Sequence, residues 1–155
     1  MREIKFRAKR IYSGEWVYGQ LVIPHIERVR ILPDGTIKTI GPQKDAAIYN
    51  DLIDPQDPWK TVDPDTIGQF TGLTDRNGEE IYEGDIFTVK GKHPRVVLWD
   101  KMRWALMPTE YFHDEIFWVM NLQHPGVDWW EEFADEFEVI GNIFDNPELI
   151  PATDK

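Results

Sequence analysis

Carboxylates are the commonest side chains in this sequence that could carry out chemistry, and they are densest in one short run. Residues 128–138 read DWWEEFADEFE. Such a run could provide a carboxylate pair for acid–base catalysis or ligands for a catalytic magnesium ion. On a helix, however, four carboxylates would share one side at spacings of three and four residues: Asp128, Glu131, Glu132 and Asp135. Aromatic residues would fill the other side, which is the pattern of an amphipathic surface helix.

The same run is also a candidate interface. Like charges at these helical spacings repel by about 0.2–0.5 kcal/mol per pair, and a basic partner would relieve the repulsion. Trp129 and Trp130 are adjacent, so we expect one of them to point away from the core of its own chain. The candidate interface residues are Trp129, Trp130, Glu131, Glu132 and Asp135. The basic partner would be a separate protein or the basic N-terminal segment of a neighbouring subunit.

Other catalytic arrangements find little support in the sequence. The chain has no cysteine, and its single serine, Ser13, is not in the Gly-x-Ser-x-Gly motif of hydrolases. The four histidines are far apart and form no i, i+4 pair that would hold zinc on a helix. The glycines match neither phosphate-binding nor dinucleotide-binding spacing. We therefore predict no catalytic residue, no metal site and no cofactor.

Two alternatives from other functional classes remain open. One is a metal-dependent hydrolase that uses carboxylates among Asp85, Asp100, Asp114 and Glu115. The other is a regulator that binds nucleic acid or mimics another protein.

The charge of the chain limits its partners. The formal net charge is -11, and after residue 75 there are 7 basic against 17 acidic side chains. An acidic surface repels phosphates, and the tryptophan-rich segment lacks Lys and Arg after Arg103, so we do not expect nucleic acid as a partner. No apolar stretch reaches the roughly 20 residues of a membrane span, and the start lacks a signal-peptide core. We expect a soluble, cytoplasmic protein with no membrane association.

The glycine-rich block at residues 69–89, QFTGLTDRNGEEIYEGDIFTV, is interpreted as architecture rather than as a catalytic loop. A type I turn from Asp75 through Asn77 to Gly78 has Asp and Gly at the positions that this turn favours. Gly78 is predicted to have a positive φ. Gly84 and Asp85 mark a second corner, where a bulge would suit glycine.

The elements around this block are mostly strands. A hairpin about Ser13–Gly14 would place Phe6 opposite Leu21, and a second hairpin would place Ile31 opposite Ile37. Three further strands, DIFTV, RVVLW and RWALM, follow one another as a meander. The pattern predicts a mainly β fold, a small barrel or sandwich built from hairpins and a meander, with one or two short helices near the C-terminus.

The domain organisation is expected to be simple. We predict one domain over residues 1–155, or alternatively two lobes at 1–40 and 62–150. Residues 41–61 would then be a linker or lid, with one short strand around Ala46 to Tyr49.

Five segments together carry a resemblance to a known family: REIKFRA, GEWVYG, QFTGLTDRNGEEIYEGDIF, RVVLW and EVIGNIFDNPELI. They resemble the YopX family, whose members are encoded mainly by phages and prophages. The resemblance implies a mainly β fold and a homo-oligomer, and it implies no reaction or catalytic residue. Our hypothesis is therefore a non-enzymatic, self-associating accessory protein of a phage or prophage.

Overall fold

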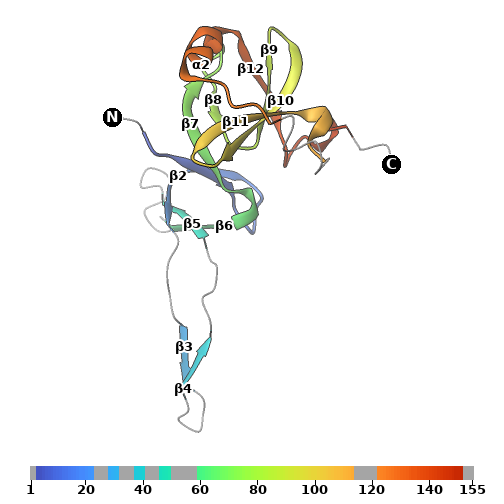
Figure 1. Ribbon diagram of the computed structural model, residues 1–155. Coiled ribbons are helices and arrows are strands. Elements are labelled where there is room, and N and C mark those ends of the chain that lie inside the picture. Colours follow the sequence, from blue (N-terminus) through green and yellow to red (C-terminus); the bar gives the residue numbers. More distant parts are fainter. Residues whose placement is uncertain are drawn as a thin grey trace. The chain divides into compact units, whose positions relative to one another are not determined.

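The chain is mainly β, as predicted (Figure 1). The structure is a computed structural model, and it describes residues 3–22, 28–31, 37–40, 46–49, 59–113 and 122–151. The chain divides into two compact units, Lys5–Ile67 and Gly68–Lys155, with Met1–Ile4 grouped with the second. The described strands form open antiparallel sheets rather than a closed barrel.

In the unit Lys5–Ile67, four antiparallel strands pair in the order β6-β5-β2-β1. They are β1 (Phe6–Lys9), β2 (Trp16–Val22), β5 (Ala46–Tyr49) and β6 (Trp59–Val62). A separate hairpin joins β3 (Arg28–Ile31) to β4 (Ile37–Ile40), and Ile31 pairs with Ile37 as predicted. The short strand expected around Ala46 to Tyr49 is β5, which pairs on both sides and so belongs to a sheet.

The register predicted for the first hairpin is wrong. Phe6 pairs with Gly19 and not with Leu21, because the loop spans four residues, Ile11–Gly14, rather than two. A shift of two residues leaves every side chain on its original face of the strand. Phe6 and Leu21 therefore both still pack against the core of this unit around Val62.

In the unit Gly68–Lys155, the predicted meander forms a sheet of four strands in the order β11-β10-β9-β12. The strands are β9 (Asp85–Val89), β10 (Lys92–Asp100), β11 (Arg103–Pro108) and β12 (Phe137–Asn142). A hairpin of β7 (Gly68–Thr74) and β8 (Glu80–Tyr82) precedes them. Short helical segments are η1 (Pro64–Thr66) in the first unit and η2 (Thr109–Tyr111), α2 (Val127–Phe133), η3 (Ala134–Glu136) and η4 (Pro147–Leu149) in the second.

Both faces of the β11-β10-β9-β12 sheet are buried. Neighbouring residues on a strand point to opposite sides, so the same strands contribute to two cores. One face belongs to a core of Ile81, Phe87, Val97, Leu106, Trp130 and Phe137. The other belongs to a core of Ile86, Val96, Met107 and Ile150. The helix α2 thus covers one face through Trp130, and the C-terminal segment covers the other through Ile150.

None of the helices that the structure describes is long and apolar enough to cross a membrane.

Candidate functional site

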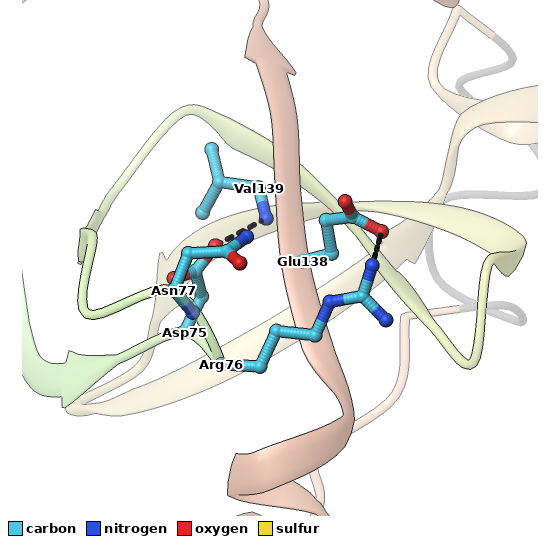
Figure 2. Close-up of polar contacts among 5 residues, drawn as sticks. All are labelled: Asp75, Arg76, Asn77, Glu138 and Val139. Carbon is cyan, nitrogen blue, oxygen red and sulfur yellow. Dashed lines mark hydrogen bonds and ion pairs between the residues drawn. The ribbon is translucent and has the colours of Figure 1, made fainter.

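The carboxylate of Asp75 is buried and accepts hydrogen bonds from three backbone N–H groups. Its Oδ1 accepts from Asn77 at 2.8 Å and from Glu79 at 2.9 Å. Its Oδ2 accepts from Val139 in β12 at 3.1 Å (Figure 2). The N–H of Gly78 donates to the carbonyl of Asp75 at 3.0 Å, which closes the turn, and the φ of Gly78 is +82°.

These contacts determine the charge state of Asp75. Burial acts to raise its pKa, but the backbone N–H groups of Glu79, Val139 and Asn77 stabilise the charged form and lower the pKa overall. Its two oxygens are occupied by donors that are fixed in the backbone. The group is therefore suited to holding a turn in place and not to accepting protons from a substrate.

Arg76 fastens the same turn to β12. Its N–H donates to the carbonyl of Phe137 at 3.0 Å, and its Nη2 lies 2.6 Å from Oε2 of Glu138 (Figure 2). Strand β12 is at one end of its sheet, and an uncovered strand edge would be open to pairing with another chain. The turn from Asp75 to Gly78 covers this edge.

Gly84 and Asp85 form the corner between β8 and β9. Gly84 has a φ of +85°, and its N–H donates to the carbonyl of Val97 at 2.8 Å. The side chain of Asp85 is 1% exposed, and its Oδ2 accepts a hydrogen bond from the N–H of Tyr82 at 2.7 Å. The register shifts on either side of β9 are in β12, between Val139 and Gly141, and in β10, between Lys92 and Arg95, and not at Gly84.

The carboxylates of the hydrolase hypothesis are in different settings. Asp85 is buried at the corner, whereas Oδ2 of Asp100 lies 2.7 Å from Nε2 of His124. Asp114 and Glu115 lie outside the described residues. In the part of the chain that the structure describes, no three His, Asp or Glu side chains are grouped so that they could hold a metal ion.

The adjacent tryptophans of the acidic run have different environments. Trp130 is 8% exposed and belongs to the core, with its ring centroid 5.8 Å from that of Phe137. Trp129 is half-buried, and its ring packs edge-on against Trp130 at 5.4 Å. The part of this pair that reaches the surface is therefore Trp129.

Three carboxylates of the run are exposed, and we call them the acidic face: Asp128, Glu132 and Asp135. Glu131 lies in α2 between them, but its side chain is outside the described part of the structure. Of the candidate interface residues that the structure describes, Trp129, Glu132 and Asp135 therefore reach the surface.

An open pocket of about 310 Å³ lies between α2 and the turn from β9 to β10. We call it the basic-aromatic pocket, and its lining residues are Val89, Lys90, Lys92, His93, Arg95, Trp129 and Phe133. Lys90 and His93 have positive φ values of +55° and +52°, so the turn is held in a conformation that costs each of them roughly 1–2 kcal/mol. The N–H of Lys90 donates to the carbonyl of Glu136 at 3.1 Å, which attaches the turn to η3.

Arg95 is the most enclosed cation of the pocket. Its Nε donates to Oε1 of Gln123 at 3.3 Å, and its Nη1 donates to the carbonyl of His93 at 3.2 Å. Burial lowers the pKa of Arg95, while the negative charge of Glu110 acts in the opposite direction. An arginine in such a setting remains charged, with its guanidinium held in one orientation.

The tip of the β10–β11 hairpin is a second exposed feature, and we call its residues Trp99, Lys101, Met102 and Arg103 the tip cluster. The loop contains only Lys101 and Met102, with φ values of +44° and +73°. Two positive φ values are typical of a type I′ hairpin turn, which favours Asn and Gly and costs other residues about 1–2 kcal/mol each.

A cross-strand aromatic pair holds this tip. Trp99 is opposite Trp104, and their rings meet edge to face with centroids 4.8 Å apart. Even so, Met102 is 87% exposed and Trp99 is 41% exposed. The tip therefore presents large apolar side chains to solvent from an energetically unfavourable turn.

Neither the pocket nor the tip cluster is among the sites predicted from the sequence. The tip had a local signal, because WDKMRW is symmetrical about its two central residues, as a two-residue hairpin loop requires. The pocket had none, because its cations and its rings lie in separate segments, residues 90–95 and 129–133.

Comparisons with known proteins give one family. The model of the YopX protein family matches residues 5–151. No curated protein matches the chain. Among solved structures, the chain is similar to the crystal structure of protein EF1440 from Enterococcus faecalis, with 22% sequence identity and a TM-score of 0.48 over 97% of this chain and 100% of that chain.

Proposed function

The chain belongs to the YopX family. We propose that it is a non-enzymatic interaction protein that assembles with further copies of itself. We further propose that it is an accessory protein of a phage or prophage. The tip cluster is the observation that supports this proposal. Met102 is almost fully exposed and adopts a left-handed conformation that glycine would adopt without cost. A feature that weakens the fold of its own unit is best explained by a contact outside it.

The charge of the tip cluster indicates what it binds. Lys101 and Arg103 are exposed beside Met102, in a chain whose formal net charge is -11. The acidic face offers the opposite charge on the same chain, on the surface of α2 and η3. Opposite charges at the rim of a contact steer association and fix its orientation, while the apolar centre supplies affinity. We therefore assign the tip cluster of one copy to the acidic face of the next.

Strand pairing between copies is a less suitable mode of assembly. One end of the β11-β10-β9-β12 sheet is covered by the turn from Asp75 to Gly78. At the other end, Leu106 and Gln123 exchange two backbone hydrogen bonds of 2.8 Å. Both edges are thus partly occupied within the chain, which favours assembly through side chains over strand addition.

The surfaces that meet in this proposal are different, so the contact is head-to-tail. Such contacts close into a ring when the rotation between copies permits, and otherwise they extend into a filament. The assembly should therefore be larger than a dimer.

Light scattering at micromolar concentration tests the proposal. We expect the wild-type protein to have a mass well above the 18.2 kDa of one chain, and the Met102→Gly variant to have a lower mass. Glycine removes the apolar side chain and also the strain in the turn, so a loss of assembly cannot be attributed to unfolding. Tyr12→Ser is the matched control, because Tyr12 is 91% exposed in the loop of another hairpin. A monomeric wild-type protein, or equal effects of both substitutions, would refute the proposal.

A further inference from the structure

We propose that the basic-aromatic pocket binds single-stranded nucleic acid, with a base stacked on Trp129 and the neighbouring phosphates held by Lys92 and Arg95. Proteins that bind single strands without sequence preference combine a cationic groove with aromatic rings on which bases stack. The sequence order separates these two ingredients, but the fold brings them together in one pocket.

The cations of the pocket are concentrated in an otherwise acidic part of the chain. Residues 76–155 contain 7 Lys and Arg residues, and three of them, Lys90, Lys92 and Arg95, line this pocket. Nζ of Lys90 lies 3.4 Å from Oε1 of Glu136, which offsets part of its charge. Lys92 is exposed and makes no ion pair or side-chain hydrogen bond with any residue that the structure describes. Lys92 and the fixed guanidinium of Arg95 are therefore the groups best placed for phosphates.

Trp129, the aromatic wall of the pocket, is supported by neighbouring aromatic rings. Trp129 packs against Phe133 with ring centroids 5.3 Å apart, and edge-on against the buried ring of Trp130. A ring supported in this way loses little conformational freedom when a ligand binds. Stacking of a base on such a ring contributes about 1–3 kcal/mol per base and tolerates any base, because each has a π-face.

A nucleic-acid strand fits this pocket better than a peptide does. Extended peptides commonly bind by adding a strand to the free edge of a sheet. The pocket is on β9 and β10, the two inner strands of their sheet, and neither has a free edge. An apolar wall beside the exposed Lys92 and the fixed guanidinium of Arg95 suits a flat base with a phosphate on each side.

Fluorescence anisotropy of a labelled oligothymidylate of about 12 nucleotides tests the proposal. We expect binding that weakens as salt rises, with a slope of log K against log salt of about -0.7 per phosphate contact. Lys92→Ala should weaken binding several-fold at low salt and reduce the magnitude of that slope by about 0.7. Arg76→Ala removes one positive charge from the same unit outside the pocket, and it should leave the affinity almost unchanged. Equal losses in the two variants, or no binding at about 50 mM salt, would overturn the assignment.

The aromatic component needs its own variants. Trp129→Phe keeps a ring and should retain most of the binding. Trp129→Leu keeps apolar bulk without a π-face and should weaken binding about 5- to 150-fold, which corresponds to about 1–3 kcal/mol. Thermal unfolding of both variants checks that they are folded. If Trp129→Leu is folded and binds as well as the wild type, the stacking role is refuted.

Two competitors separate a nucleic-acid strand from simpler anions. Unlabelled oligonucleotide should displace the probe, whereas thymidine monophosphate and poly-glutamate at equal charge concentration should not. Displacement by the mononucleotide at the same concentration would show a site for free nucleotides, and displacement by poly-glutamate would show charge attraction alone. Either result would contradict the proposal.

Discussion

The Oδ2 atom of Asp75 accepts a 3.1 Å hydrogen bond from the backbone N–H of Val139, a residue 64 positions further along the chain. Through this contact the turn of the glycine-rich block at residues 69–89 holds β12 in place. The same carboxylate holds its own turn through Asn77 and Glu79. The presence of Asp75 in this block is therefore explained by its structural role.

Substitution of Asp75 by Asn should lower the stability of the protein. The amide has one acceptor oxygen instead of two, and its NH₂ group would face a backbone donor, so we expect a loss of about 1–3 kcal/mol in the free energy of unfolding at pH 7. Urea unfolding measures this loss. Glu79→Gln removes an exposed carboxylate from the same loop, and it should have little effect.

The same carboxylate predicts a dependence of stability on pH. The pKa of Asp75 is lowered in the folded state from its ordinary value of 3.8. Its contribution is therefore fully present above that value and is lost as the pH falls towards the lowered pKa. The free energies of unfolding of the wild type and of Asp75→Asn should thus converge below about pH 4. A difference that stays constant down to acidic pH would contradict this explanation.

Gly78 should tolerate substitution according to how readily the new residue adopts a positive φ. A Cβ at this position would meet nothing within 4 Å, so backbone strain alone decides the outcome. We expect Gly78→Val to lose about 1–2 kcal/mol or more, a fall of about 2–8 °C in Tm. Gly78→Asn should lose clearly less, because Asn enters the left-handed region more easily. Equal transitions for the two variants in differential scanning calorimetry would disprove the role of φ.

Replacing the carboxylate of Glu83 by a neutral group should stabilise the fold. Burial raises the pKa of Glu83 above its ordinary value of 4.5. The N–H of Trp99, which donates to Oε1 at 3.4 Å, acts in the opposite direction without cancelling this rise. A raised pKa means that the charged form is disfavoured by folding, so its cost is present at neutral pH and disappears as the pH falls below the ordinary value. Glu83→Gln keeps the acceptor for Trp99 and should raise Tm at pH 7 but not at about pH 4. An unchanged or lower Tm at pH 7 would contradict the prediction.

Local patterns predicted those parts of the fold that local physics determines. Asp and Gly at fixed positions of a turn, alternating apolar residues and a short amphipathic helix each leave a signal within a few residues. The predicted loop of the first hairpin is wrong because Ser13–Gly14 suggests a two-residue loop, whereas the chain forms a four-residue one. The consequence was small, since a shift of two residues keeps Phe6 and Leu21 on the same face.

Surface sites built from distant segments left no such signal. The absence of Lys and Arg from residues 104–154 argues against a surface that stacks bases, yet Lys92 and Arg95 line a pocket with Trp129. That pairing depends on how α2 lies against the turn from β9 to β10, which is a tertiary relationship. The tip cluster differs, because the symmetry of WDKMRW indicates a two-residue loop at Lys101 and Met102, although an apolar residue in a hairpin is usually assigned to the core.

The most direct test of head-to-tail assembly is the mass of a mixture of two variants that are each defective on one surface. Met102→Asp disables the tip cluster and Glu132→Lys disables the acidic face, so each alone should remain at 18.2 kDa in light scattering. When they are mixed in equal amounts, the intact tip of one can bind the intact face of the other, and growth must stop there. We predict a species of twice the single-chain mass in the mixture and in neither variant alone. A mixture that contains only single chains, or variants that assemble as the wild type does, would contradict the account.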